Sequence, residues 1–242
     1  MKKSIIILGI TALIAGHCFG QTNNNTNSKE MEENKDNLHD NLKNYIPVKE
    51  FNIEEFNVKR NRNRCRFVDE EGMEVEQTVS TEYPSGKVKK YWEHRKYPNS
   101  GYKFYSEYDA NGKLVETSIS FYGMVTGFIC FYNTSGNIIN KEDWDEPYKF
   151  SIDDLINKMK TQYDIDIVDT RICSVISRGV YDKYNNTPLY SVYLYGDPKE
   201  HQLICYVIDG NTGKTLYATT RYIRDDRKSI VDEYFNSLKE PK

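Results

Sequence analysis

Residues 101–114 decide the fold of the first half of the chain, and they run Gly-Tyr-Lys-Phe-Tyr-Ser-Glu-Tyr-Asp-Ala-Asn-Gly-Lys-Leu. The part ending at Tyr108 is rich in Phe and Tyr, which favour half-buried strands. Asn111-Gly112 is a strong hairpin signal, because glycine adopts the positive φ that a tight turn requires. The segment therefore predicts a β-hairpin with Gly112 at positive φ.

The same arrangement recurs along the chain. Residues 83–88 and 132–138 also place an aromatic residue before a polar turn, a glycine and a branched residue, and residues 67–73 are a weaker copy. The glycines of three turns, Gly86, Gly112 and Gly136, recur at intervals of about 25 residues, a period that predicts stacked hairpins with a shared core. We expect residues 47–146 to form one antiparallel sheet, with Gly136 at positive φ like Gly112.

Two copies also carry a leading glycine, at Gly101 before Tyr108 and at Gly127 before Tyr132. This arrangement resembles the MORN-type repeats of the bacterial antitoxin-like family over about residues 82–144. The resemblance implies a hairpin-repeat fold and an antitoxin-like role.

Residues 147–242 show a different pattern. Ser151 is a good helix N-cap with Asp154 at the capping-box position, and apolar residues follow at helical spacing up to Tyr163. Strand-like runs are Ile165 to Ile176, Leu189 to Tyr195 and Leu203 to Ile208, followed by a tight turn into a short strand. A final amphipathic helix is expected from near Asp225, with one apolar face formed by Ile230, Val231, Tyr234, Phe235 and Leu238.

The turn that begins at Asp209 has the form D-x-x-T-G-K-x-L, and Tyr190-Ser191-Val192-Tyr193 precedes it. These features resemble the PepSY domain over about residues 150–218. The resemblance implies an envelope domain that binds or restrains other proteins, often peptidases, without chemistry of its own. The expected fold class is α+β: an antiparallel hairpin-repeat sheet, then a helix plus a three-stranded antiparallel sheet with a C-terminal helix.

The N-terminus has the features of a secretory signal peptide over residues 1–20. Lys2 and Lys3 precede an apolar run over residues 5–16, and Cys18-Phe19-Gly20 provides a cleavage site before Gln21. The apolar run is short for a membrane anchor. Cleavage before a lipidated Cys18 is the second route, because residues 15–18 loosely resemble a lipobox. We expect a periplasmic or secreted protein, or a lipid-anchored one.

Residues 21–46 are polar and are expected to form a disordered linker. The exported chain keeps four cysteines, and Cys18 only if it is lipidated, and the four are candidates for disulfides. These are Cys65, Cys130, Cys173 and Cys205. The alternative is that they are buried small apolar residues in strands.

Little in the sequence indicates catalysis. His39, His94 and His201 lie in polar segments and are expected to be solvent-exposed, and no nucleophile, zinc or phosphate-loop motif occurs. An uncharacterised hydrolase is therefore the least supported function, and we expect no cofactor and no metal. The net charge of −3, from 33 basic and 36 acidic residues, argues against nucleic acid as a partner.

Three charged segments have alternative interpretations. The acidic run 142–146 fits a solvated loop at the domain junction, a protein contact, or a catalytic or calcium-binding cleft. Asp164, Asp166 and Asp169 are expected on the outer face of a strand. The basic run 59–66 fits either a charged edge strand or a dock for an acidic partner.

These features favour an exported, non-catalytic protein that binds another protein. The first expectation is an immunity protein that neutralises a toxin in the periplasm, and the alternative is a PepSY-type inhibitor or regulator of an envelope peptidase. Tryptophan, tyrosine and arginine concentrate binding energy at interfaces, which makes two patches candidates. One is Trp92 with Arg95 and Tyr97, and the other is Trp144 with Glu142, Asp143 and Asp145.

Overall fold

The computed structural model describes residues 45–182, 185–197, 199–223 and 229–239. The chain divides into a unit from Met1 to Tyr45 and a unit from Ile46 to Lys242. The expected signal peptide, Cys18 and the expected linker lie outside the described residues, apart from Tyr45 and Ile46. Within the described ranges, no helix is both long enough and apolar enough to cross a membrane.

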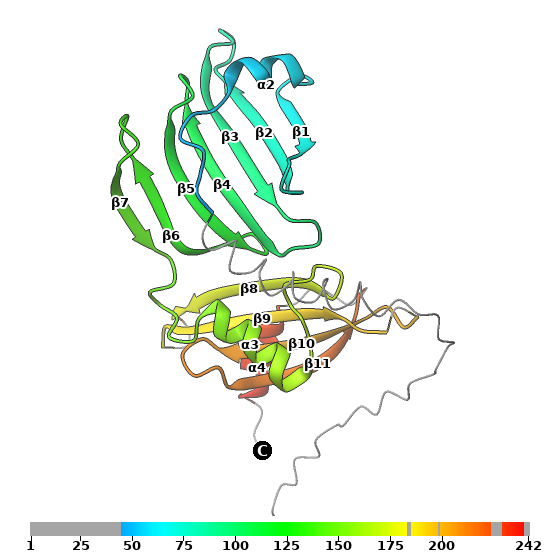
Figure 1. The fold of residues 1–242 in the computed structure, drawn as a ribbon. Coiled ribbons are helices and arrows are strands. Elements are labelled where there is room, and N and C mark those ends of the chain that lie inside the picture. The colour runs from blue at the N-terminus through cyan, green and yellow to red at the C-terminus, as the bar shows by residue number, and fades with distance from the viewer. Residues whose placement is uncertain (1–44, 183–184, 198, 224–228, 240–242) are drawn as a thin grey trace, which may run out of the picture. The chain divides into compact units, whose positions relative to one another are not determined.

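The first half of the larger unit is a seven-stranded antiparallel sheet in which strands neighbour each other in chain order (Figure 1). Its strands are β1 (Arg64–Val68), β2 (Glu74–Thr81), β3 (Val88–Lys96), β4 (Tyr102–Asp109), β5 (Leu114–Phe121), β6 (Met124–Tyr132) and β7 (Ile138–Asp143). The predicted hairpin sheet is confirmed, and each hairpin pairs with the next along the chain.

Three of the repeated turns share one hydrogen-bond pattern, whereas the turn at Gly86 has no Asx side chain and is closed by a bond from the Gly86 amide to the Glu82 carbonyl. The carboxylate of Asp109 accepts from the amides of Asn111 and Lys113, each at 2.8 Å. Asp69 and Asn133 make the same pair of bonds at the turns that lead into β2 and β7. The glycine three residues later lies at φ +81° in Gly112 and +76° in Gly136, as predicted. An Asx side chain and a glycine at fixed spacing therefore produce each of these turns.

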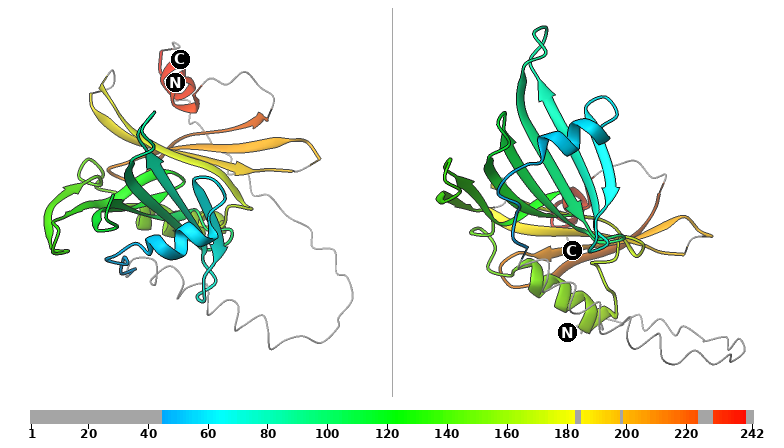
Figure 2. Two further views of the ribbon diagram at one scale, coloured as in Figure 1. Left: turned by 90° about the horizontal axis from the view of Figure 1, so that it is seen from above. Right: turned by 45° about the horizontal axis from the view of Figure 1, so that its top comes forward.

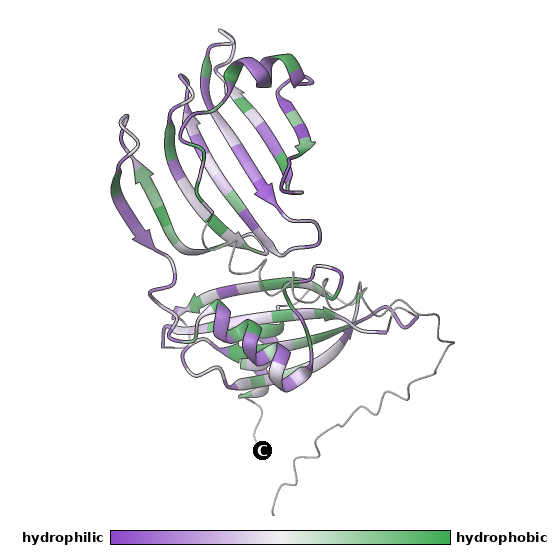
Figure 3. Cartoon of the chain, viewed as in Figure 1, coloured by the Kyte–Doolittle hydropathy of each residue, from purple (hydrophilic) through white to green (hydrophobic). Residues whose placement is uncertain are grey.

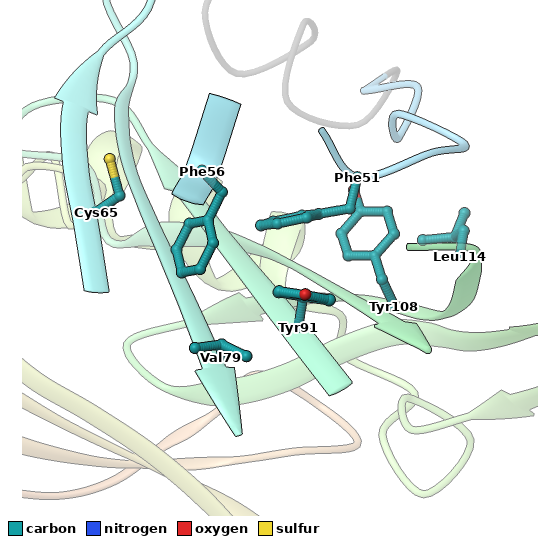
Figure 4. Packing of buried hydrophobic residues seen from close by; sticks show 7 residues of the cluster. All are labelled: Phe51, Phe56, Cys65, Val79, Tyr91, Tyr108 and Leu114. Atoms are coloured by element: carbon teal, nitrogen blue, oxygen red, sulfur yellow. The ribbon is translucent and has the colours of Figure 1, made fainter. Parts of the chain in front are cut away.

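A short helix, α2 (Ile53–Lys59), lies inside the region expected to be entirely β. It begins at Asn52, whose side chain accepts from the Glu55 amide at 3.1 Å, and it ends with Lys59 in its last turn. Phe56 anchors it to the sheet together with Phe51, Tyr91 and other buried residues, as Figure 4 shows. The rings of Phe51 and Tyr91 stack with their centroids 4.6 Å apart. A capped amphipathic turn that can bury Phe56 overrides the expected strand.

The second half is a four-stranded antiparallel sheet of order β11-β10-β9-β8, where three strands were expected. Its strands are β8 (Cys173–Tyr181), β9 (Thr187–Tyr195), β10 (Gln202–Asp209) and β11 (Thr215–Tyr222). The strand expected from Ile165 begins only at Cys173, and the expected short strand after Gly213 is a full partner of β10.

The placement of Asp164, Asp166 and Asp169 on a strand face is wrong. Asp164 is the left-handed C-cap of the preceding helix, at φ +57°. Asp166 accepts from the Val168 amide at 3.0 Å and Asp169 from the Arg171 amide at 2.9 Å. Aspartate side chains that bond their own backbone two residues on stabilise turns, and turns replace the strand here.

Helices lie on both faces of the four-stranded sheet (Figures 1 and 2). The helix α3 (Ile152–Tyr163) has the predicted Ser151–Asp154 capping box, and in Figure 3 it carries alternate hydrophilic and hydrophobic bands. The helix α4 (Ile230–Ser237) begins after Ser229, and Asp225 lies outside the described residues. Its Ile230, Val231 and Phe235 pack on Cys205 and Val207, whereas Leu238 is 63% exposed.

The four candidate disulfide cysteines are free thiols. Cys65 on β1 and Cys130 on β6 have four strands between them, which places them on the order of 20 Å apart. Cys173 and Cys205 oppose Leu194 and Tyr193, neighbours along β9, and therefore lie on opposite faces. Burial raises the pKa of each of these two thiols to about 11. The alternative expectation, small apolar core residues, fits Cys65, Cys173 and Cys205, which are all buried.

Candidate functional site

The seven-stranded sheet has two unlike faces. Along β4 buried Tyr102, Phe104, Ser106 and Tyr108 alternate with less buried Lys103, Tyr105 and Glu107. The buried series belongs to the face that carries α2, which we call the covered face. The other, the open face, includes Arg64, Arg66, Glu76, Lys90, Trp92, His94, Lys96, Lys103, Tyr105, Glu107 and Glu116.

A hydrogen-bond network occupies the middle of the open face. One carboxylate oxygen of Glu107, Oε2, accepts from Lys90 Nζ at 2.9 Å, from Trp92 Nε1 at 2.8 Å and from the Tyr105 hydroxyl at 2.7 Å. The Lys90 ammonium also lies 5.1 Å from the centre of the Trp92 ring. These contacts hold an indole and a phenol in fixed orientations on a partly exposed surface.

The network sets the charge states of its neighbours. Burial alone would raise the pKa of Glu107, but the hydrogen bonds from Lys90, Tyr105 and Trp92 outweigh it and lower that pKa. Glu116 lies directly opposite Glu107 on β5, and burial together with the Glu107 charge raises its pKa. Burial and hydrogen bonding to Glu107 raise the pKa of Tyr105. Glu107 is therefore an ionised anchor for its donors.

His94 lies next to this network, two residues before the end of β3. Its ring is 5.3 Å from that of Tyr105, and its Nδ1 is buried without a hydrogen-bond partner among the described residues. Burial, and then the charge of Lys103, lower the pKa of His94, which keeps the imidazole neutral at neutral pH. The expectation that His94 is solvent-exposed is therefore wrong, because its side chain is half-buried, whereas His201 is exposed in a turn.

Two adjoining hollows lie at the β1 end of the open face. The larger, of about 600 Å³, is lined by Arg66, Phe67, Val68, Glu74, Val75, Glu76, His94, Lys96 and Lys103. The smaller, of about 410 Å³, is lined by Asn61, Arg62, Arg64 and Arg66. Arg66 lines both. We call the two together the basic hollow.

The expected patch around Trp92 is not one surface. Neighbours along a strand point to opposite faces, so Trp92 lies on the open face while Tyr91 and Arg95 lie on the covered face. Arg95 is 17% exposed and forms ion pairs with Asp69 at 2.8 Å and Glu93 at 2.6 Å. Burial, and then the charges of Glu71 and Asp69, raise the pKa of Tyr97.

Some residues of the patch around Trp144 are exposed, whereas Asp145 forms contacts within the protein. Glu142 and Asp143 are exposed on β7, and the Trp144 side chain is 49% exposed. Asp145 instead pairs with Arg178 of β8 at 2.7 Å and accepts from the Gly127 amide at 2.9 Å. Arg178 also donates to the backbone oxygens of Val125 and Trp144, at 2.6 and 3.0 Å. This end of the acidic run therefore stabilises the junction between the two sheets.

The open-face network was missed in the sequence, although a signal for it exists. Period-two alternation over residues 102–109 separates Tyr105 and Glu107 from the buried residues, and the same rule applied to residues 88–96 places Lys90, Trp92 and His94 together. What alternation cannot provide is the pairing of β3 with β4 that brings Trp92 opposite Glu107.

In the described ranges, no cluster of three or more His, Cys, Asp or Glu side chains could hold a metal ion. His94 points to the open face, whereas Cys65 and Cys130 belong to the covered face, opposite Gln77 and Thr117. Family models, curated proteins and solved structures were all compared with the chain, and none matches.

Proposed function

We propose that this chain is an exported, non-catalytic protein-binding protein whose interface is the open face of the seven-stranded sheet. The observation that carries the proposal is the Glu107 network, in which one carboxylate fixes Trp92, Tyr105 and Lys90. Aromatic side chains held in place before binding lose little conformational entropy on association, and Trp and Tyr dominate interface energetics. The signal-peptide pattern of residues 1–20 supports export.

Within this class, neutralisation of a toxin in the periplasm is the first role that we propose. It rests on the resemblance of residues 82–144 to antitoxin-like repeats together with the export signal. Restraint of an envelope peptidase, from the PepSY-like features of residues 150–218, is the alternative. A pull-down from envelope extract with mass spectrometry separates the two, because a toxin encoded beside this protein supports the first and a peptidase the second.

The interface is tested by calorimetry with the partner so identified. Trp92→Ala should cost about 2 kcal/mol or more of affinity. Tyr105→Phe should cost less, because it removes one hydrogen bond to Glu107 and keeps the ring. Ile139→Ala, on exposed β7, is the matched control and should bind like the native chain, and all variants should keep its melting temperature to within a few degrees. Unchanged binding by Trp92→Ala would refute the open face, and selective loss with Trp144→Ala would place the interface at that loop.

A further inference from the structure

The charge of the basic hollow is opposite to that of the chain. Five cationic side chains line it or its rim, Arg62, Arg64, Arg66, Lys96 and Lys103, against the two acids Glu74 and Glu76. The whole chain has a net charge of −3. A local excess of positive charge on an acidic protein concentrates anionic ligands at that place.

Several of these cations are available to a ligand. Glu76 is shared between Arg64, at 3.2 Å, and Arg66, at 2.7 Å, so one carboxylate serves two guanidinium groups. Lys96 pairs with Glu74 at 2.9 Å. Arg62 and Lys103 have no acidic partner among the described residues, and both are exposed. The buried Nδ1 of His94, also without a partner there, adds a polar atom to the lining.

The strand at this end is an edge. β1 is the first strand of the sheet, and beyond Arg64, whose amide and carbonyl both bond Asn61, the outer side of its backbone has no neighbouring strand among the described residues. Arg64 and Arg66 project from the same face two residues apart. An extended segment that pairs with β1 would present alternate side chains to that face at about 7 Å intervals, the spacing of these two arginines. Carboxylates on those side chains would form charge-assisted contacts with them.

We propose that the basic hollow and the free edge of β1 bind an acidic, extended segment of the partner protein. This inference rests on the proposed function and specifies the partner's chemistry. Discrete carboxylates fit the lining better than a continuous phosphate backbone, because Glu74 and Glu76 stand between the cations and would repel closely spaced charges. The hollow of about 600 Å³ also falls in the range of ordinary ligand sites.

The probe is a short synthetic peptide of alternating Glu and Thr, labelled for fluorescence anisotropy and titrated with the full chain. The same peptide with Gln in place of Glu is the ligand control. We expect the acidic peptide alone to bind, and more weakly at high salt because exposed charges are screened. Arg66→Gln and Lys103→Gln should each weaken binding about tenfold, the effect of losing one charge-assisted contact. Lys141→Gln, on the opposite edge strand, should change nothing.

Equal binding of the Glu and Gln peptides would overturn the inference. So would an equal loss in Lys141→Gln, which would indicate nonspecific attraction, or displacement of the peptide by a single-stranded DNA oligonucleotide that binds more tightly. The failure of the proposed function looks different. If the partner's affinity falls with Trp92→Ala but does not change with Arg66→Gln or Lys103→Gln, the acidic segment is refuted and the proposed function stands. If the peptide binds but no protein partner is found, the proposed function is refuted and the acidic-segment inference stands.

Discussion

The two sheets of this protein differ in how many of their faces are covered. The four-stranded sheet is covered on both faces, by α3 and α4, and its β9 strand is buried at six of nine positions. The seven-stranded sheet buries one face and leaves Trp92, Tyr105 and several charged residues half-exposed on the other. Antiparallel sheets can have one solvated face, so the second arrangement is stable without cover. We infer that the smaller sheet supplies stability and the larger one a binding surface.

Breaking the junction between the sheets should have the largest effect. Arg178 is 6% exposed, and its loss would remove the ion pair to Oδ1 of Asp145 and the donor to two backbone oxygens, leaving Asp145 only the Gly127 amide at Oδ2. Arg178→Met should lower the free energy of unfolding by about 3–5 kcal/mol, towards the lower end because a third of Asp145 reaches solvent. Urea denaturation measures this.

The control for the junction is Arg171→Met, since Arg171 pairs with Asp169 but is 63% exposed, and exposed ion pairs contribute little. Two separate transitions in the native chain, with only one of them shifted by Arg178→Met, would show that the sheets unfold independently and would contradict a shared junction.

The comparison is tested directly by truncating one apolar side chain on each sheet. Leu155 of α3 is fully buried against the four-stranded sheet, and Leu155→Ala should cost about 2–5 kcal/mol because a cavity remains. Ile139 of β7 is 66% exposed, and Ile139→Ala should cost less than about 1 kcal/mol. Chemical denaturation of both variants decides the matter. Equal losses would mean that the larger sheet depends on this side chain as much as the smaller one depends on Leu155.

Substitution of the turn glycines should have an intermediate effect on stability. Gly112 lies at φ +81°, and a Cβ there would stand 3.0 Å from the Phe51 carbonyl oxygen. Gly112→Val should destabilise the fold by about 1–3 kcal/mol. Gly72, at φ +80° with nothing within 4 Å of its Cβ position, is the control that retains the backbone strain and lacks the crowding. If Gly72→Val is as costly as Gly112→Val, packing of residues 51–53 against the turn has no energetic role.

The smallest expected effect is on pH dependence. Burial and Lys103 lower the pKa of folded His94 below its ordinary value of 6.5. As the pH falls below about 6.5, the unfolded chain takes up this proton first, so stability decreases until the folded pKa is passed and is constant beyond it. His94→Gln should lose that part of the slope in denaturation curves measured across this range. In NMR titrations, Lys103→Gln should move the His94 pKa upwards, and an unshifted pKa would contradict a role for the Lys103 charge.

The sequence predicted what depends on local chemistry. Gly112, Gly136 and the Ser151–Asp154 capping box are short-range features, and each is present as expected. Predictions that depend on partners far along the chain were less successful. Asp166 and Asp169 bond their own backbone, so β8 begins later than periodicity alone indicated. Phe56 is buried beside Tyr91, so the helix α2 forms where periodicity alone indicated a strand. The grouping of Trp92 with Arg95 was wrong because residues an odd number of positions apart on a strand point to opposite faces.

The sequential pairing of β1 to β7 has a consequence for how this surface can evolve. Every strand pairs only with its neighbours in the chain, and the turns after Asp69, Asp109 and Asn133 share one hydrogen-bond pattern. Duplication or loss of one hairpin within the series would widen or narrow the open face by two strands, about 10 Å, without changing the connections between the other strands. Selection can therefore change the width of the surface by one hairpin at a time, while point substitutions change what each hairpin recognises.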